Sequence, residues 1–254
     1  MYYSVCLPAV LRGVPMEESL KTVRKAGFDR YEIWGWWNLE LENMQNIASE
    51  QDLSITALCT KFVPLTNPDL REQYLEGLKE TALTCRKLGC KTVISQVGQE
   101  LQGVSRKLQH KSIVEGLKAC VPILEAYNLT LVIEPLNTKI NHPGYYLWKA
   151  SEAFEIIEEV GSEQVKVLYD LYHQYVMDDL DLDAIVQNID KIGHFHMAGF
   201  PGRNEPFIKS EIDYNAILKV IKESGYRYSV GMEYIPVYNT EKGLKDLFLQ
   251  LQQI

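Results

Sequence analysis

Short apolar runs rich in β-branched residues alternate along the chain with longer stretches in which apolar residues recur every three to four positions. The short runs have the length and composition of buried strands, and the longer stretches have the periodicity of amphipathic helices. Strands are predicted at Tyr3–Cys6, Arg30–Trp34, Ser54–Cys59, Thr92–Gln96, Thr130–Pro135, Lys166–Asp170, Gly193–Met197 and Ser229–Tyr234. Helices are predicted, among others, at Met16–Ala26, Leu70–Leu88, Val104–Tyr127, Lys149–Val160, Leu182–Lys191, Asp213–Ser224 and Thr240–Gln253.

This alternation predicts a parallel sheet with crossover helices, and eight strands is the number that closes a (β/α)8 TIM barrel. Several predicted helices run into a glycine just before the next strand, as in KAGFDRYEIW, KLGCKTVIS and ESGYRYSVGMEY. An open doubly wound sheet would alternate in the same way, but the segment CLPAVLRG lacks the glycine-rich turn expected after its first strand. Because no linker or low-complexity tract divides the chain, we expect one domain over residues 1–254.

Ionisable residues end the last four predicted strands: Glu134, Asp170, His196 and Glu233. Catalytic groups of such barrels lie at the carboxyl ends of the strands, where the βα loops form one mouth. Since strand side chains alternate between the two faces, all four groups are predicted to point inward at a similar height. His194 shares that inward face, and we expect it to be a core histidine satisfied by hydrogen bonds.

Three carboxylates at close range raise one another's pKa unless a positive charge lies among them. A divalent metal ion would supply that charge, and a set of oxygen ligands with one imidazole favours Mn²⁺ or Mg²⁺, with Co²⁺ also suitable. His142, His173 and Arg203 follow later strands and are candidates to bind the oxygens of a substrate. The Trp36–Trp37 pair is a candidate to cover an apolar face of that substrate.

Composition narrows the class of ligand. The net charge of −8 disfavours binding to a phosphate backbone, so a small neutral or weakly charged substrate fits better than a nucleic acid. The five cysteines lack C-x-x-C spacing and fall mostly in apolar runs, which predicts reduced, buried thiols. Without a basic leader or a run of about 18 apolar residues, the chain is expected to be cytoplasmic and not bound to a membrane. Aromatic residues in the loops are compatible with a homo-oligomer in which a neighbouring chain partly covers the mouth of the barrel.

Five motifs, VIEPLN, NHPGYYL, YDLYHQ, GHFHMAGFPGRNEP and GMEY, together resemble the hydroxypyruvate isomerase family. That family belongs to the xylose-isomerase-like TIM barrels, with ketose 3-epimerases and inosose dehydratases as relatives. The resemblance implies that Glu134 and Glu233 are the acid/base pair and also bind the metal, with Asp170 and His196 as the other ligands. Two positions depart from the hydroxypyruvate isomerases. His196 stands where they often have glutamine and 3-epimerases have histidine, and Gly199 stands where aspartate is common.

A metal that chelates a hydroxyl and an adjacent carbonyl oxygen makes the neighbouring C–H acidic, so the reaction class expected is isomerisation through an enediolate. The substrate is expected to be a sugar or a hydroxy-keto acid, with a ketose 3-epimerase as the alternative. An abasic-site endonuclease would need histidines at the ends of the third and fourth strands, and residues 53–66 and 92–100 contain none. A sugar-binding protein without catalysis is disfavoured because both glutamates of the acid/base pair are present.

Overall fold

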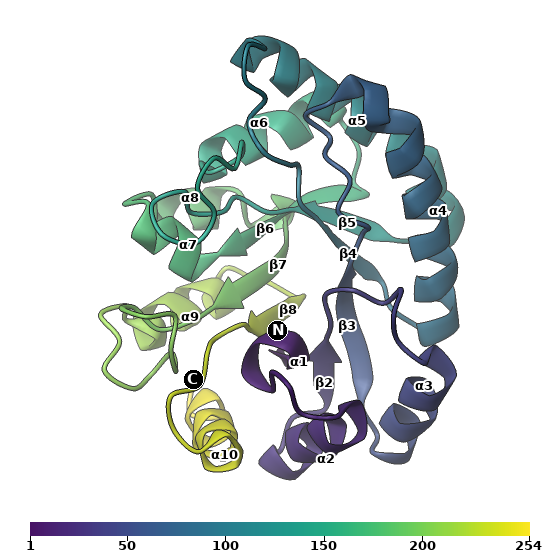
Figure 1. The fold of residues 1–254 in the computed structure, drawn as a ribbon. Helices are drawn as coiled ribbons and strands as arrows, with labels where there is room; N and C mark the ends of the chain where they lie inside the picture. Colours follow the sequence, from purple (N-terminus) through teal and green to yellow (C-terminus); the bar gives the residue numbers. More distant parts are fainter.

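A computed structural model describes residues 1–254 and shows a closed barrel in which eight parallel strands pair in sequential order (Figure 1). The barrel closes where β1 pairs with β8, with Tyr2 opposite Ser229 and Val5 opposite Met232. The predicted TIM barrel is confirmed, and each strand bound lies within two residues of its predicted position. The strands are β1 Tyr2–Cys6, β2 Arg30–Glu32, β3 Ser54–Cys59, β4 Thr92–Ser95, β5 Thr130–Ile133, β6 Val165–Asp170, β7 Ile192–Met197 and β8 Ser229–Met232.

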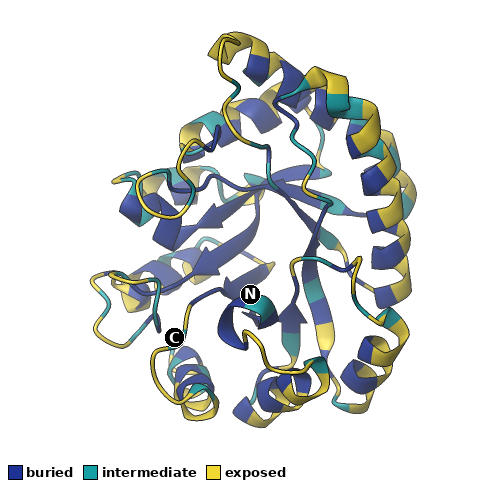
Figure 2. Ribbon diagram, viewed as in Figure 1, coloured by how far each residue is buried: buried dark blue, intermediate teal, exposed yellow.

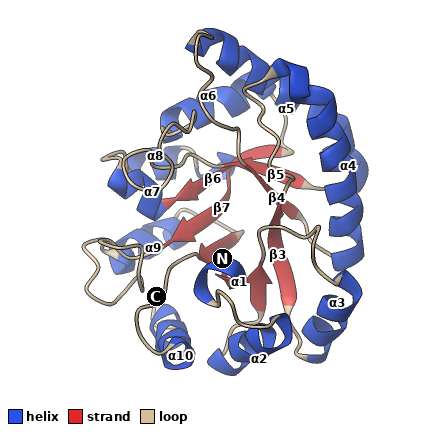
Figure 3. Cartoon of the chain, in the orientation of Figure 1, coloured by secondary structure: helices blue, strands red, loops and turns tan.

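Helices form a ring around the strands (Figure 3). They are α1 Leu7–Val10, α2 Met16–Ala26, α3 Leu41–Glu50, α4 Arg71–Leu88, α5 Arg106–Tyr127, α6 Ala150–Val160, α7 Leu171–Val176, α8 Leu182–Gln187, α9 Tyr214–Glu223 and α10 Thr240–Leu251, with short 3-10 turns η1 Pro68–Leu70 and η2 Ile189–Lys191. The sequence did not predict α1, α3 or α7. The predicted helix Leu182–Lys191 is divided at Asn188, whose backbone leaves the helical region between α8 and η2.

Glycine ends helices α2 and α4 as predicted. Gly27 and Gly89 both have left-handed backbone angles, with φ of 108° and 73°, and their N–H groups donate back to Arg24 and Cys85. A side chain is disfavoured in that conformation, so glycine turns the chain into the next strand without strain.

The core has two parts. A large apolar cluster fills the space between the strands and the inner faces of the helices, whose outer faces are exposed (Figure 2). A smaller cluster inside the barrel contains Ala57, Cys59, Ile94, Val132 and Leu168. Polar residues from β1, β2 and β7, among them Ser4, Glu32 and His194, are buried in the structure as well. The barrel is therefore apolar around β3 to β6 and polar where β1, β2 and β7 contribute side chains.

All five cysteines are free and buried, as the sequence predicted. None of the helices is both long and apolar enough to span a bilayer.

Candidate metal and catalytic site

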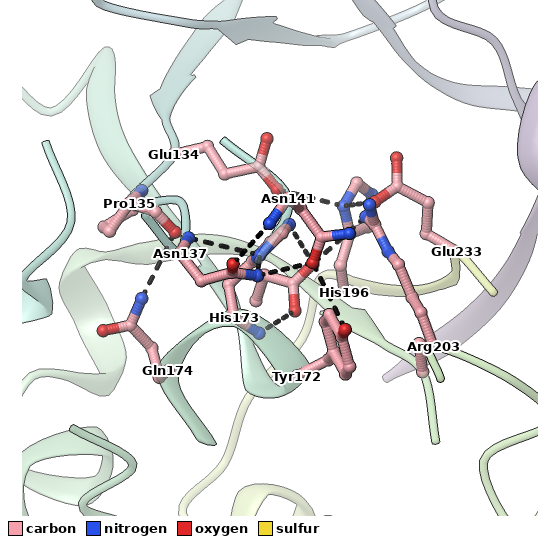
Figure 4. Close-up of polar contacts among 12 residues, drawn as sticks. Glu134, Pro135, Asn137, Asn141, Tyr172, His173, Gln174, His196, Arg203 and Glu233 are labelled. Atoms are coloured by element: carbon pink, nitrogen blue, oxygen red, sulfur yellow. Dashed lines mark hydrogen bonds and ion pairs between the residues drawn. The ribbon is translucent and has the colours of Figure 1, made fainter. Parts of the chain in front are cut away.

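Four ionisable side chains converge at the carboxyl ends of neighbouring strands, and Figure 4 labels three of them, Glu134, His196 and Glu233. Glu134 follows β5, Asp170 ends β6, His196 lies in β7, and Glu233 follows β8. One potential ligand atom from each residue lies within 4.8 Å of the others. All four are buried, with at most 6% of the residue exposed. The structure thus brings together the set that the strand ends predicted.

Local structure fixes two of the carboxylates. Asp170 is the N-cap of α7, and its Oδ1 accepts the backbone N–H of His173 at 2.9 Å. Oε1 of Glu233 accepts the indole N–H of Trp34 at 2.8 Å, while Oε2 forms an ion pair with Arg203. These contacts satisfy part of each carboxylate and hold it toward the shared point.

The two glutamates have opposite electrostatic surroundings. Burial raises the pKa of Glu134 to about 7, with the charges of Glu233 and Asp170 acting in the same direction and His196 opposing them. Burial would also raise the pKa of Glu233, but Arg203 and His196 outweigh it and hold that pKa well below its usual range. One carboxyl therefore exchanges a proton near neutral pH while the other stays ionised, a difference typical of acid/base pairs.

Two buried polar atoms at the point of convergence have no hydrogen-bond partner: Oε1 of Glu134 and Nδ1 of His196. They lie 3.4 Å apart, and Nδ1 lies equally far, 3.4 Å, from Oε2 of Glu233. Buried polar atoms without partners are uncommon and need an explanation. Three carboxylates and one imidazole nitrogen aimed at one point fit a divalent cation that prefers oxygen ligands.

A pocket of about 180 Å³ opens beside these residues. Such a volume lies below the range of roughly 300–1,000 Å³ of sites for drug-sized ligands, so it suits a short substrate. Its walls are polar on the side of the glutamates and apolar on the side of β3 and β4. The lining residues are Trp34, Cys59, Phe62, Ile94, Gln96, Glu134, His142, His196, Arg203 and Glu233.

The residues predicted to bind substrate occupy different places. His142 and Arg203 line the pocket. Arg203 lies in a left-handed backbone conformation with φ of 58°, which is uncommon for a residue other than glycine and is typical of functional loops.

His173 is fully buried and does not line the pocket. Its Nδ1 accepts the backbone N–H of Asn137 at 3.3 Å, and its Nε2 lies 3.6 Å from Oδ2 of Asp170. Burial lowers the pKa of His173 to about 4, so the ring is neutral at pH 7. Its Nε2 faces the carboxylate of Asp170 but has no hydrogen-bond partner.

The family model described as xylose isomerase-like TIM barrel matches residues 20–253. The chain belongs to the xylose isomerase-like TIM-barrel family. Hydroxypyruvate isomerase of Escherichia coli (strain K12) is 35% identical over 178 residues, 70% of this chain and 68% of that protein. A putative hydroxypyruvate isomerase of Mus musculus is 31% identical over 250 residues, 92% of this chain and 88% of that protein.

Solved structures of other proteins have the same fold as this chain. One described as an AP endonuclease, family 2, from Brucella melitensis superposes with a TM-score of 0.90 at 26% identity, covering 98% of this chain and 99% of that one. D-psicose 3-epimerase from Clostridium cellulolyticum H10 superposes with a TM-score of 0.86 at 17% identity, covering 100% and 99%. The family places this xylose isomerase-like chain among sugar isomerases and epimerases.

The sequence analysis did not identify the aromatic residues that line the pocket or a buried carboxylate next to it. Trp34, read as the end of a strand, lines the pocket together with Phe62, whereas Trp36 and Trp37 do not. Glu32 is a buried carboxylate in β2 that contacts His196. A charged residue in a buried strand was the available signal for Glu32, because such residues are seldom buried without a partner.

Proposed function

We propose that this protein is a metal-dependent isomerase of short hydroxy-keto compounds that works through an enediolate, with Glu134 and Glu233 as the acid/base pair. The observation that carries the proposal is the pair of buried carboxylates that lie on either side of His196 and line one small pocket. Glu134, Asp170, His196 and Glu233 would hold one Mn²⁺ or Mg²⁺, which when bound supplies Lewis-acid polarisation of the carbonyl and hydroxyl oxygens of the substrate.

The residues of the chain divide the proton transfer between them. Glu233, kept ionised by Arg203 and oriented by Trp34, accepts the proton from the carbon beside the carbonyl. Glu134, whose Oε1 lies 3.4 Å from Nδ1 of His196 as Oε2 of Glu233 does, delivers a proton to the neighbouring carbon, and the roles exchange in the reverse direction. The indole of Trp34 and the ring of Phe62 line the pocket beside the glutamates and give it an apolar surface.

The small pocket and the two hydroxypyruvate isomerase relatives support a short hydroxy-keto acid as the substrate. A carboxylate group on the substrate needs a cation, and Arg203 supplies one in the pocket wall. His142, on the same wall, is placed to donate to or accept from a substrate oxygen.

Deuterium incorporation tests the proposal. Incubated in D2O with hydroxypyruvate and Mg²⁺, the enzyme should introduce deuterium on the hydroxymethyl carbon beside the carbonyl, visible by NMR, and Glu233→Gln should abolish the exchange. Conversion without any deuterium would indicate a hydride shift and would contradict the acid/base role of the two glutamates.

A ketose 3-epimerase is the second candidate, favoured by His196, since histidine is usual at this position in the 3-epimerase relatives. Deuterium at C3 of a ketose, with inversion there, would establish this alternative. An abasic-site endonuclease receives no support from the site, because the pocket walls from β3 and β4 are formed by Cys59, Ile94 and Gln96, without an imidazole. The two clusters of potential metal ligands, Glu32–His194–His196 and Glu134–Asp170–His196–Glu233, share His196.

A further inference from the structure

Glu32 lies fully inside the barrel, 1% exposed, with every contact of its carboxylate made to another strand. Oε1 accepts the hydroxyl of Ser4 from β1 at 2.9 Å. Oε2 lies 3.0 Å from Nε2 of His194 and 3.1 Å from Nε2 of His196, both on β7. A carboxylate can only accept hydrogen bonds when ionised, so both imidazoles must donate from Nε2.

That requirement decides the orientation of His196. A neutral imidazole carries one proton, and if Nε2 holds it then Nδ1 has the free lone pair. Nδ1 is the ring atom that faces Glu134 and Glu233 and has no hydrogen-bond partner. In the neutral ring, which is the form that can bind a metal, the contact with Glu32 therefore selects the tautomer and the ring rotation that present a lone pair to the site.

The backbone of β8 leaves room for this contact. A Cβ atom at Gly231 would lie 2.0 Å from Oε1 of Glu32 and 2.7 Å from Cδ2 of His196. Real Cβ atoms do not approach other atoms so closely, and the residue opposite His196 on β8 is Gly231 itself. The sequence of β8 thus accommodates the Glu32 carboxylate against His196.

We infer that Glu32 is a positioning residue for the proposed metal site: it holds His196 as the Nε2–H tautomer, so that Nδ1 becomes the metal ligand. The inference rests on the proposed function only in assuming that a metal binds at Glu134, Asp170, His196 and Glu233. Carboxylate or carbonyl partners of ligand histidines commonly change metal affinity by about 10- to 100-fold when removed. Glu32 would act by the same route without touching the substrate.

NMR of the ring nitrogens tests the inference directly in the wild-type protein. In ¹⁵N-labelled protein loaded with diamagnetic Mg²⁺, the Nε2 of His196 should carry a proton and the Nδ1 should not. A proton on Nδ1, or a second metal ion bound by Nε2 and Glu32, would overturn the assignment. This readout does not depend on turnover, so it stays informative even if no substrate of the proposed class reacts.

Variants of Glu32 measure the size of the effect. Glu32→Ala should weaken Mn²⁺ binding, measured by calorimetry, about 10- to 100-fold. Glu32→Gln should lose less, because an amide oxygen can still accept from both Nε2–H groups while its NH2 group donates to Ser4. Glu32→Gln keeps the size of the side chain, so it gives a folded sample if the alanine variant does not fold.

Ser4→Ala is the matched control, since it removes a partner of the other oxygen of Glu32 and leaves the histidine contacts in place. Its Mn²⁺ affinity should stay within about threefold of wild type. Wild-type affinity together with the wild-type tautomer in folded Glu32→Ala would overturn the inference. Normal metal binding and tautomer without exchange of any substrate proton would instead contradict the proposed function alone.

Discussion

Glu134 and Glu233 are the same residue type in different surroundings. Glu233 has an indole N–H and a guanidinium as partners, whereas Oε1 of Glu134 has no partner. Their different pKa directions follow from these contacts and not from the strands that carry them.

Replacing either carboxylate by an amide should remove proton transfer and keep the fold. We expect Glu134→Gln and Glu233→Gln each to lower kcat for hydroxypyruvate by about 10²- to 10⁴-fold, the usual range for loss of a general acid or base. The circular dichroism spectrum should be unchanged. The exposed Glu155→Gln on α6 is the control and should retain full activity. A rate within a few-fold of wild type for either site variant would exclude its assigned role.

The residues at the ends of β5 to β8 could be predicted because strand alternation fixes which side chains point inward. Other residues of the site depend on packing that no local pattern encodes. His173 follows Asp170 by three residues in a helix too short for a periodic signal, so its full burial was not predictable. Trp34, and neither Trp36 nor Trp37, donates to Glu233, from a loop position two residues after β2 ends at Glu32.

At the scale of elements, Asp170 belongs to both β6 and the cap of α7. Its Oδ1 accepts the N–H of His173, and Oδ2 faces the side chains of His173 and Arg203. One side chain therefore begins a helix and contributes a carboxylate to the candidate metal site.

Two substitutions of Asp170 separate its role as the cap of α7 from its role as a candidate metal ligand. Asp170→Asn keeps a capping oxygen, so the free energy of unfolding of the metal-free protein should exceed that of Asp170→Ala by about 1 kcal/mol in urea denaturation. Both variants should bind Mn²⁺ more weakly than wild type, since both remove the negative charge. Equal stability of the two variants would show that the cap contributes nothing measurable to α7.

Substitution of Gly231 tests how closely the backbone of β8 must approach the side chains of Glu32 on β2 and His196 on β7. Gly231→Ala should displace Glu32 and His196, which we expect to lower Mn²⁺ affinity and to destabilise the fold by about 1–3 kcal/mol. Gly243→Ala on α10 is the control, because a Cβ there meets nothing within 4 Å and alanine favours the helix. Metal affinity equal in both variants would contradict the close packing around Glu32.

Helices and strands were predicted correctly where the pattern of apolar residues was long enough to show a clear period. The strands and the long helices follow clear periodicities, and their bounds were predicted to within a few residues. Helices α1 and α7 have four and six residues, too few for a helical period to be recognised. Helix α3 does carry apolar positions at Leu41, Met44 and Ile47, so its signal was present in the sequence.

At the scale of the whole molecule, the buried ionisable cluster links stability to pH. Burial would lower the pKa of His196, but Glu233 and Glu32 raise it well above its usual value. Glu134 also has a raised pKa, about 7. A native state that holds protons more tightly than the unfolded state is most stable at low pH and loses that stability as pH rises through the native pKa.

The free energy of unfolding of the metal-free protein should therefore fall between pH 7 and pH 8. The slope should approach about 1.4 kcal/mol per pH unit for each proton retained only in the native state. Urea denaturation at both pH values measures it. His196→Gln should flatten the slope, and saturating Mg²⁺ should reverse it, because bound ligands must be deprotonated. Identical slopes in the wild type and His196→Gln would show that His196 does not hold the proton.

The five free thiols all lie in the first half of the chain, where their alkylation rates can probe the barrel. Cys59 alone among the cysteines lines the pocket, and Cys6 lies beside the candidate site, with its Sγ 3.8 Å from Oε1 of Glu233. Burial and the charges of Glu134 and Glu233 raise the pKa of the Cys59 thiol well above its usual range, so a small alkylating reagent should react slowly there, while Cys85, Cys90 and Cys120 require the strands and helices to separate. The modification rate at Cys59 then reports occupancy of the pocket by a bound compound, and the rates at Cys85, Cys90 and Cys120 report transient opening of the fold.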